Sequence, residues 1–420
     1  MTFTLEKTIQ NKKIYISLVY LIIYTFWGFI FERTIFESQN MRFACFLSLF
    51  FFFFISSNSR HNGFKHIVIQ SWLPYILYTI LGYFLFTTFQ YVFFWATVLL
   101  MLYNAERMYD SIPIKLFLFS GLFGLLGVYF QLCFPELYIQ YVVPFFPNSI
   151  IVSWMTDLHG LAGFTYQLDQ TAIIILFLFF YVLFFCKFSN NKKGQLAKIL
   201  FIIAIVSGLV LAGKRSILIV SIFVPILVKF LEQSNQKRTL IFIIILFILG
   251  SVVYYYAMSN LTELSQVGFL GRYFNSISEY QAGEDISSNR YNLYAIAWKA
   301  FEDNIVFGCG VGQFINYTHS YSDVHNVYLQ VLCEQGIFGF LLFFVPILIC
   351  IIRTVVILKH VSDLGKSYLE FSLAVQLYYI VYGMFGNPNV NLFGFMMYYL
   401  AISILVCEES KLRQFRIKSV

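Results

Sequence analysis

The stretch FGCGVGQFINYTHSYSDVHNVYLQVLCEQGIFGFLLFF, residues 307–344, joins a polar segment to a long apolar one. Three glycines alternate with other residues at its start, and His319, Asp323 and His325 follow. From residue 329 the sequence is apolar for long enough to cross a bilayer as a helix, which takes about 17–25 residues. The stretch therefore predicts a membrane helix with a cluster of polar side chains at one end.

The whole chain follows the same pattern. Of its 420 residues 59% are hydrophobic and 12% are charged, whereas soluble domains carry about 25% charged residues. A soluble protein is therefore excluded, and we expect an all-α polytopic membrane protein with about 12 transmembrane helices. The predicted spans are 14–31, 43–56, 66–84, 89–104, 114–133, 170–187, 199–213, 216–231, 239–257, 329–352, 368–385 and 390–407.

The distribution of basic residues predicts the orientation. If both termini are cytoplasmic, the inner segments hold 21 of the 28 Lys and Arg residues. This matches the positive-inside rule at every pair of loops. The net charge of +7 is thus a topology signal, and because no basic patch forms we expect no nucleic-acid partner.

Two extracytoplasmic segments, 134–169 and 258–328, are too long to be simple turns, and such segments are usually functional. We expect 1–420 to form a single membrane domain that carries both loops. Within the second loop, residues 290–303 place apolar side chains at helical spacing, which predicts an amphipathic helix on the bundle or the membrane surface.

Four of the seven basic residues predicted to lie outside are candidates for the site. Lys214 and Arg215 stand between two spans, where they either reach toward lipid phosphates or bind a phosphate or pyrophosphate. Arg272 and Arg290 lie in the larger loop, where each either pairs with a neighbouring carboxylate or serves the site.

The glycine cluster "GCGVG" lacks the strand that precedes a dinucleotide-binding loop, and it lies outside the cytoplasm. We expect Gly308, Gly310 and Gly312 to provide positive φ or a close approach of a ligand. Cys309 and Cys333 flank this region, but their spacing does not predict a disulfide.

His325 precedes the tenth span and is either a helix cap or a base that takes a proton from a hydroxyl near neutral pH. His319 and Asp323 could join His159 as metal ligands, although their spacing matches no zinc pattern. Glu334 falls within the span, where a carboxylate needs a partner.

The stretches "SNRYNLYAIAWKAFEDNIVFGCGVGQF" and "HSYSDVHNVYLQVLCEQGIFGFLLFF" together resemble the O-antigen polymerase and ligase superfamily. That family has an arginine, a short helix, a glycine turn, and then "HN.yl..l.e.G..G" before a span. The matching residues are Arg290, Trp298, Ala300, Gly308, Gly310, Gly312, Phe314, His325, Asn326, Tyr328, Leu329, Leu332, Glu334, Gly336 and Gly339.

Two further stretches resemble the family. "LAGKRS" is similar to a small-residue-plus-arginine stretch at the outer end of a central span, which puts Arg215 in the place of that arginine. "HGLAGFTYQLDQTA" resembles another family segment, but His159 stands where arginine is usual and Gln167 to Asp169 replace a Pro-Asn pair.

The resemblance implies a GT-C-like membrane glycosyltransferase that uses undecaprenyl-pyrophosphate-linked oligosaccharides, with no metal and no cofactor. Arg215 and Arg290 would bind the donor pyrophosphate, and His325 would activate the acceptor hydroxyl. We expect substrate contacts around these three catalytic residues, from Lys214, Arg272, Asn326, Gly308, Gly310, Gly312, His319, Asp323 and His159.

A polymerase joins repeat units to one another, whereas a ligase transfers glycan to another acceptor. Usage rich in Phe, Ile, Asn and Lys is typical of an AT-rich genome and favours a bacterium without a lipid A-core acceptor. A polymerase of the plasma membrane is therefore our prediction, with its active site on the extracytoplasmic face. The alternatives are ligase-type transfer and a flippase for the same lipid-linked sugars. The resemblance also implies a flippase and a chain-length regulator as partners, together with membrane lipid.

Overall fold

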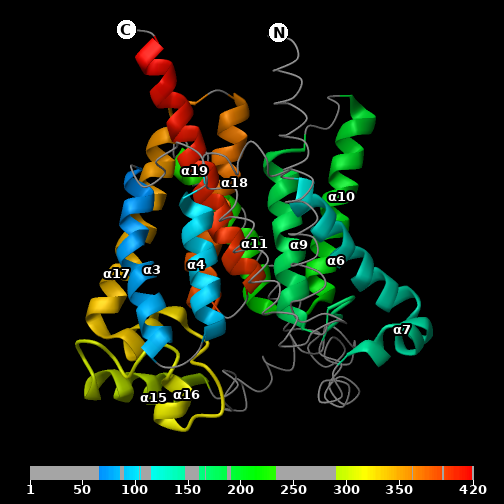
Figure 1. Ribbon diagram of the computed structural model, residues 1–420. Coiled ribbons are helices and arrows are strands. Elements are labelled where there is room, and N and C mark those ends of the chain that lie inside the picture. Colours follow the sequence, from blue (N-terminus) through cyan, green and yellow to red (C-terminus); the bar gives the residue numbers. More distant parts are fainter. Residues whose placement is uncertain are drawn as a thin grey trace, which may run out of the picture. The chain divides into compact units, whose positions relative to one another are not determined.

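The computed structural model describes residues 66–85, 89–103, 105, 115–146, 160–165, 167–186, 191–232, 290–361, 363–389 and 392–418. Within these ranges the chain forms helices joined by turns, and no β-strand occurs in them (Figure 1). The expected all-α class is confirmed for this part of the protein.

Three of the described helices are long and apolar enough to cross a membrane: α3 (Ile67–Leu85), α10 (Lys192–Leu211) and α17 (Val327–Leu358). The pair Phe119–Cys133 and Pro135–Phe145, bent by 114°, gives a fourth if it counts as one broken span. Each predicted span in the described ranges coincides with a helix. The spans 14–31, 43–56 and 239–257 lie outside those ranges, so the number of twelve and the topology stay predictions.

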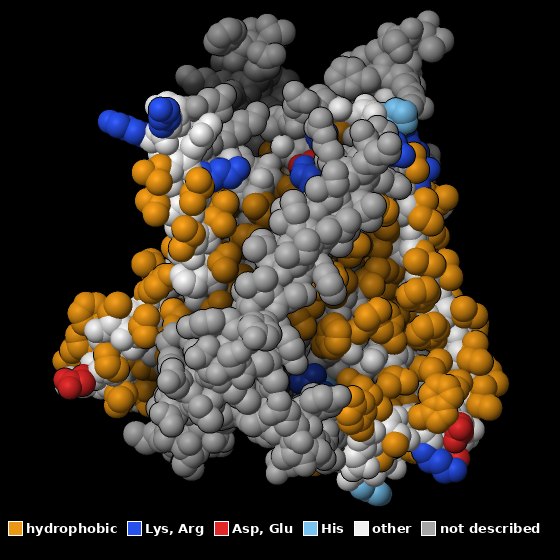
Figure 2. Space-filling model, turned by 180° about the vertical axis from the view of Figure 1, so that it is seen from behind, with side chains coloured by type: hydrophobic (Ala, Val, Ile, Leu, Met, Phe, Trp, Pro, Cys, Tyr) orange, Lys and Arg blue, Asp and Glu red, His pale blue; other side chains and the backbone are white. Residues whose placement is uncertain are grey.

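Apolar side chains also cover the flanks of these helices. Figure 2 shows hydrophobic side chains over much of the described surface on one face of the molecule. On α10 the side chains of Leu196, Ile199, Leu200 and Ile203 are each more than half exposed. A helix that presents such a surface to its surroundings needs lipid there, which agrees with a multi-pass membrane protein.

The chain divides into two compact units, and the division falls within α6 (Lys115–Cys133) and α15 (Arg290–Asp303). The first unit contains α3, α4 (Phe89–Tyr103), α16 (Phe314–Thr318), α17, α18 (Asp363–Gly383) and α19 (Leu392–Lys418). It also contains α15 from Asn292 onward. In this unit α17 packs against α3 and α18, and α19 packs against α18 and α4.

Aromatic rings fill the centre of the first unit. Trp72 contacts Tyr75, Phe343, Tyr398 and Tyr399 edge to face, with ring centroids 5.3–6.4 Å apart. Such pairs contribute about 0.5–1.5 kcal/mol each beyond their buried area. The rings therefore join α3, α17 and α19 into one rigid bundle.

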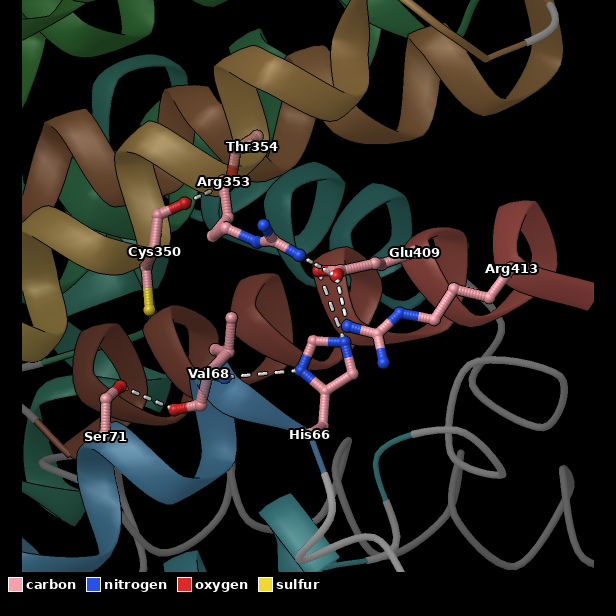
Figure 3. A network of polar contacts seen from close by, with 8 residues as sticks. All are labelled: His66, Val68, Ser71, Cys350, Arg353, Thr354, Glu409 and Arg413. Atoms are coloured by element: carbon pink, nitrogen blue, oxygen red, sulfur yellow. Dashed lines mark hydrogen bonds and ion pairs between the residues drawn. The ribbon is translucent and has the colours of Figure 1, made fainter. Parts of the chain in front are cut away.

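A polar network joins α3, α17 and α19 at one end of this bundle (Figure 3). Its central residue, Glu409, lies beyond the predicted span 390–407. The carboxylate of Glu409 on α19 accepts from Arg353 on α17 and, at 2.7 Å, from Arg413. The ring of His66 lies 3.3 Å from the same carboxylate, and its Nδ1 accepts the backbone N–H of Val68 at the start of α3. Burial raises the pKa of Glu409, but these three partners outweigh it and lower the pKa to about 2.

The second unit contains most of α6, α7 (Pro135–Tyr141), the 3-10 helix η3 (Val143–Phe145), α9 (Leu168–Phe184), α10 and α11 (Arg215–Glu232). Nearly every side chain of α9 is buried, because α10 and α11 pack against it and it is apolar all round. Glycines on α6 allow close packing here, since a Cβ on Gly121 would lie 2.2 Å from Leu178.

Candidate functional site

The helix that follows the glycine cluster is broken. Inside α17, Gly336 has φ 64° and ψ −168°, which is not helical and is readily adopted by glycine. A break frees backbone N–H and C=O groups, and an unpaired group in an apolar environment costs several kcal/mol. The freed groups must therefore find partners elsewhere in the chain.

The segment 305–310 supplies those partners. The N–H groups of Cys309 and Gly310 donate to the carbonyls of Cys333 and Glu334, both at 2.9 Å. On the other side of the break, the N–H of Ile337 donates to Ile305 at 2.9 Å, and that of Phe338 donates to Val306 at 3.2 Å. The segment therefore pairs with α17 on both sides of Gly336.

Glycine is required where the two backbones meet. A Cβ on Gly308 would lie 2.2 Å from the carbonyl carbon of Glu334, and one on Gly336 would lie 2.3 Å from that of Val306. The positive φ expected for Gly308, Gly310 and Gly312 is confirmed, at 72°, 112° and 70°. The close approach at Gly308 is to the backbone of α17, which is a structural use of the glycine.

Glu334, just before the break, is buried with 6% of its surface exposed. Its carboxylate accepts the N–H of Gly312 at 2.9 Å, the N–H of Phe314 at 3.2 Å and the side-chain amide of Gln330 at 2.8 Å. A carboxylate within a span was expected to need a partner. Glu334 has three: two backbone N–H groups of the loop and the side chain of Gln330. The role of Gln330 was missed, because nothing in the sequence distinguishes it from other polar residues at the start of a helix.

The predicted polar residues cluster at the start of α17. His319 ends α16 with φ 53°, Asp323 follows, and His325 is exposed with φ 54°. Asn326 caps α17, since its side-chain oxygen accepts from the N–H groups of Tyr328 and Leu329 at 3.0 and 3.1 Å. The helix cap, one of the two roles considered for His325, is therefore provided by Asn326. His325 is exposed just before the helix.

This cluster lies at one end of the first unit. Figure 1 shows α15 and α16 together beyond the ends of α3 and α17, opposite the C-terminal end of α19. The segment 290–303, predicted as an amphipathic helix, forms α15 and buries Leu293, Ala297 and Ala300. Ala297 and Ala300 join Phe314, Val324 and Cys333 in one apolar core.

In the second unit, the structure brings two of the stretches singled out in the sequence together. The N–H of Leu161 donates to the carbonyl of Leu211 at 2.8 Å, and a Cβ on Gly160 would lie 2.7 Å from the carbonyl oxygen of Ala212. Lys214 and Arg215 follow directly, both partly buried, and Arg215 is the first residue of α11. A helix N-terminus favours anions, so the position suits the predicted phosphate contact.

Polar side chains that the sequence analysis missed hold this segment in place. The N–H of Gly163 donates to the side chain of Gln131 at 2.8 Å, and its carbonyl accepts from the hydroxyl of Tyr138. Thr171 on α9 donates to the carbonyl of Ala162.

The remaining predicted residues are placed as follows. Arg290 is the partly buried first residue of α15. His159 and Arg272 lie outside the described residues. Cys309 and Cys333 are free thiols, and the described ranges contain no group of three His, Cys, Asp or Glu side chains suited to a metal.

Comparison with protein families bears on this part of the chain. A family model described as O-antigen ligase matches residues 199–344. No curated protein matches the chain. The matched segment includes Arg215, Arg290 and His325, and it ends in α17 beyond the break at Gly336. The match supports, for this segment, the resemblance to the O-antigen polymerase and ligase superfamily seen in the sequence.

Proposed function

We propose that this protein is a polymerase that joins undecaprenyl-pyrophosphate-linked oligosaccharide repeat units into a surface polysaccharide. The reaction would take place at the extracytoplasmic face of the bacterial plasma membrane. The observation that carries the proposal is that Arg215, Arg290 and His325 all fall within the segment matched by the O-antigen ligase family. Membrane glycosyltransfer is the chemistry of that family, and these residue types suit it.

The proposed reaction is a displacement at the anomeric carbon of the donor sugar. The acceptor hydroxyl forms the new glycosidic bond while the bond to the lipid pyrophosphate breaks. His325 takes the hydroxyl proton, for which an imidazole is suited near neutral pH. Arg215 and Arg290 offset the charge that develops on the leaving pyrophosphate, and a guanidinium can bind two of its oxygens at once.

The positions of these residues support the proposed roles. His325 is exposed at the start of a candidate membrane span, so a hydroxyl can reach its ring. Arg215 lies at the N-terminus of α11 beside the segment 160–165, where the helix dipole adds to its charge. We further propose that Lys214, Arg272, His319, Asp323, Asn326 and His159 contact the two substrates, and that a flippase and a chain-length regulator act beside the enzyme.

Transfer to a different acceptor is the second candidate, because the matching family model is described as a ligase. Composition favours the polymerase, since usage rich in Phe, Ile, Asn and Lys is typical of an AT-rich genome and favours a bacterium without a lipid A-core acceptor. The two differ in what remains on the lipid carrier when the enzyme is absent.

The test is the size distribution of lipid-linked sugar and surface polysaccharide in cells that lack this protein. Single repeat units on the outer face with no long chains are expected for a polymerase. Long chains retained on the lipid carrier would identify a ligase. Single units trapped on the cytoplasmic face would identify a flippase and contradict the catalytic proposal.

A further inference from the structure

Two stacked side chains on the first turns of α17 hold the loop that carries the candidate histidine. Gln330 and Glu334 are four residues apart on the helix, so they lie on one face, and the Gln330 amide donates to the Glu334 carboxylate at 2.8 Å. Both side chains are buried, with 7% and 6% exposed. A buried carboxyl group that accepts from several donors is firmly fixed, because any movement would leave buried polar groups without partners.

Glu334 fixes the beginning of the loop. Its two oxygens accept the backbone N–H groups of Gly312 and Phe314, at 2.9 and 3.2 Å. These bonds set the start of α16, and the ring of Tyr83 on α3 packs against Gly312. The loop that leads to α17 therefore starts from a fixed position on that helix.

Gln330 fixes the end of the loop. Its side-chain oxygen accepts the N–H of Val324 at 3.0 Å, and its amide also donates to the carboxylate of Asp323 at 3.2 Å. Val324 is fully buried in the core that α15 shares with α17. The two side chains thus hold the segment 312–324 at both ends, and the end held by Gln330 is next to His325.

His325 needs such support. Its φ of 54° is left-handed, a conformation that costs a residue with a side chain about 1 kcal/mol or more. It stands between Val324, held by Gln330, and Asn326, held by its cap on α17. Fixed neighbours on both sides leave the backbone of His325 little freedom.

We propose that Glu334 and Gln330 are positioning residues that hold the imidazole of His325 in place for the acceptor hydroxyl. The proposal rests on the proposed function of His325 as the base. Neither side chain needs to contact substrate, because both act through backbone N–H groups of the loop. Their loss should lower turnover and leave binding of the lipid-linked donor unchanged.

The experiment is hydrogen–deuterium exchange of the full-length protein in lipid nanodiscs, followed on peptides from 308–328. Glu334→Ala removes all three bonds, Glu334→Gln keeps the size but loses an acceptor, and Gln330→Ala releases Val324 without a change of charge. Loss of this buried acceptor should speed exchange at Gly312 and Phe314 about tenfold or more, because their N–H groups are left without partners. Gln330→Ala should do the same at Val324.

The matched control is Glu409→Gln, a buried glutamate of the same unit whose partners are His66, Arg353 and Arg413. It should lower stability without faster exchange in 308–328. Each variant is also assayed for elongation, with lipid-linked repeat units from cells lacking the protein as the probe. If Glu334→Ala does not fold, Glu334→Gln and Gln330→Ala still decide the question.

Faster loop exchange together with a fall in turnover of about tenfold or more would support the proposal. Unchanged exchange, or faster exchange with full turnover and an unchanged KM, would overturn the positioning role. Full elongation by His325→Ala would instead contradict the proposed function, whatever the exchange rates show.

Discussion

Replacing Gly308 by alanine should separate the two backbones that meet at the break in α17. The new Cβ would lie 2.2 Å from the carbonyl carbon of Glu334 and 2.3 Å from the backbone nitrogen of Gln335, whereas ordinary contact begins at 3.4 Å. Main chain lies on both sides of the contact, so no side chain can move away to relieve it. The segment 305–310 must therefore move back by about 1 Å.

That displacement determines how much stability the variant loses. The bonds from Cys309 and Gly310 to the carbonyls of Cys333 and Glu334 are 2.9 Å long and would stretch to about 4 Å. A buried group left without its partner costs about 1–3 kcal/mol. The left-handed φ of 72° adds about 1 kcal/mol for a residue with a Cβ. We expect Gly308→Ala to lower the free energy of unfolding by about 3–7 kcal/mol.

Gly312→Ala is the matched control. Its φ of 70° is nearly that of Gly308, but the added Cβ would meet the ring of Tyr83 at 2.8 Å instead of a backbone. A ring can shift slightly, so the expected loss is about 1–2 kcal/mol from strain and that contact. The difference between the two variants isolates the backbone contact.

The assay is size-exclusion chromatography of fluorescently tagged protein after heating at a series of temperatures, in one detergent and at equal loading. Gly308→Ala should lose its monodisperse peak at a clearly lower temperature than Gly312→Ala. Equal melting of the two variants would refute the reasoning, because the shared left-handed strain would then explain both.

Three further predictions concern single side chains. Arg215→Lys should lower elongation about tenfold or more in the lipid-linked assay, because an ammonium cannot bind two oxygens of a pyrophosphate in parallel; full activity would remove that role. Asn326→Ala should lower thermal stability by about 1 kcal/mol, and Asn326→Asp should restore most of it, since the cap needs a side-chain acceptor. The pKa of Glu409 is about 2 in the folded protein against about 4.3 unfolded, so its stabilisation is complete above about pH 4.5 and is lost as the pH falls toward 2. The difference in melting between wild type and Glu409→Gln should therefore be full at pH 7, fall to about half near pH 3 and nearly vanish at about pH 2; a constant difference would contradict this assignment.

The sequence predicts the helices well because hydropathy and spacing are local signals. The apolar positions at 293, 297 and 300 recur with helical period, and α15 buries those three side chains. The alternating glycines before α17 likewise predict positive φ, which all three adopt.

The break in α17 could not be predicted in this way. Residues 329–352 read as one continuous apolar span, because Gly336 is neutral on a hydropathy scale. What makes the break stable is a set of backbone partners from 305–310, some 30 residues earlier in the chain. Local patterns do not show such pairings. Glu334 indicated that this span is unusual, since a carboxylate in a span needs partners. Its position in the sequence did not identify those partners.

The sequence predicted which residues belong to the candidate site better than it predicted which of them are in contact. The stretches around 160 and 213 were matched separately to the family, and the hydrogen bond from Leu161 to Leu211 shows that they lie together. The supporting side chains of Gln131, Tyr138 and Thr171 carry no sequence signal of their own, because each acts on a backbone group of another segment.

The most direct test of the central claim is elongation by the purified protein in proteoliposomes. The substrate is the lipid-linked repeat unit that accumulates in cells lacking the protein, given as both donor and acceptor, and the products are resolved by size. We predict a ladder of chains that grow by one repeat unit, formed by wild type and lost in His325→Ala and Arg290→Ala. Wild-type protein that is folded and binds the lipid-linked unit, but forms no ladder, would contradict the account.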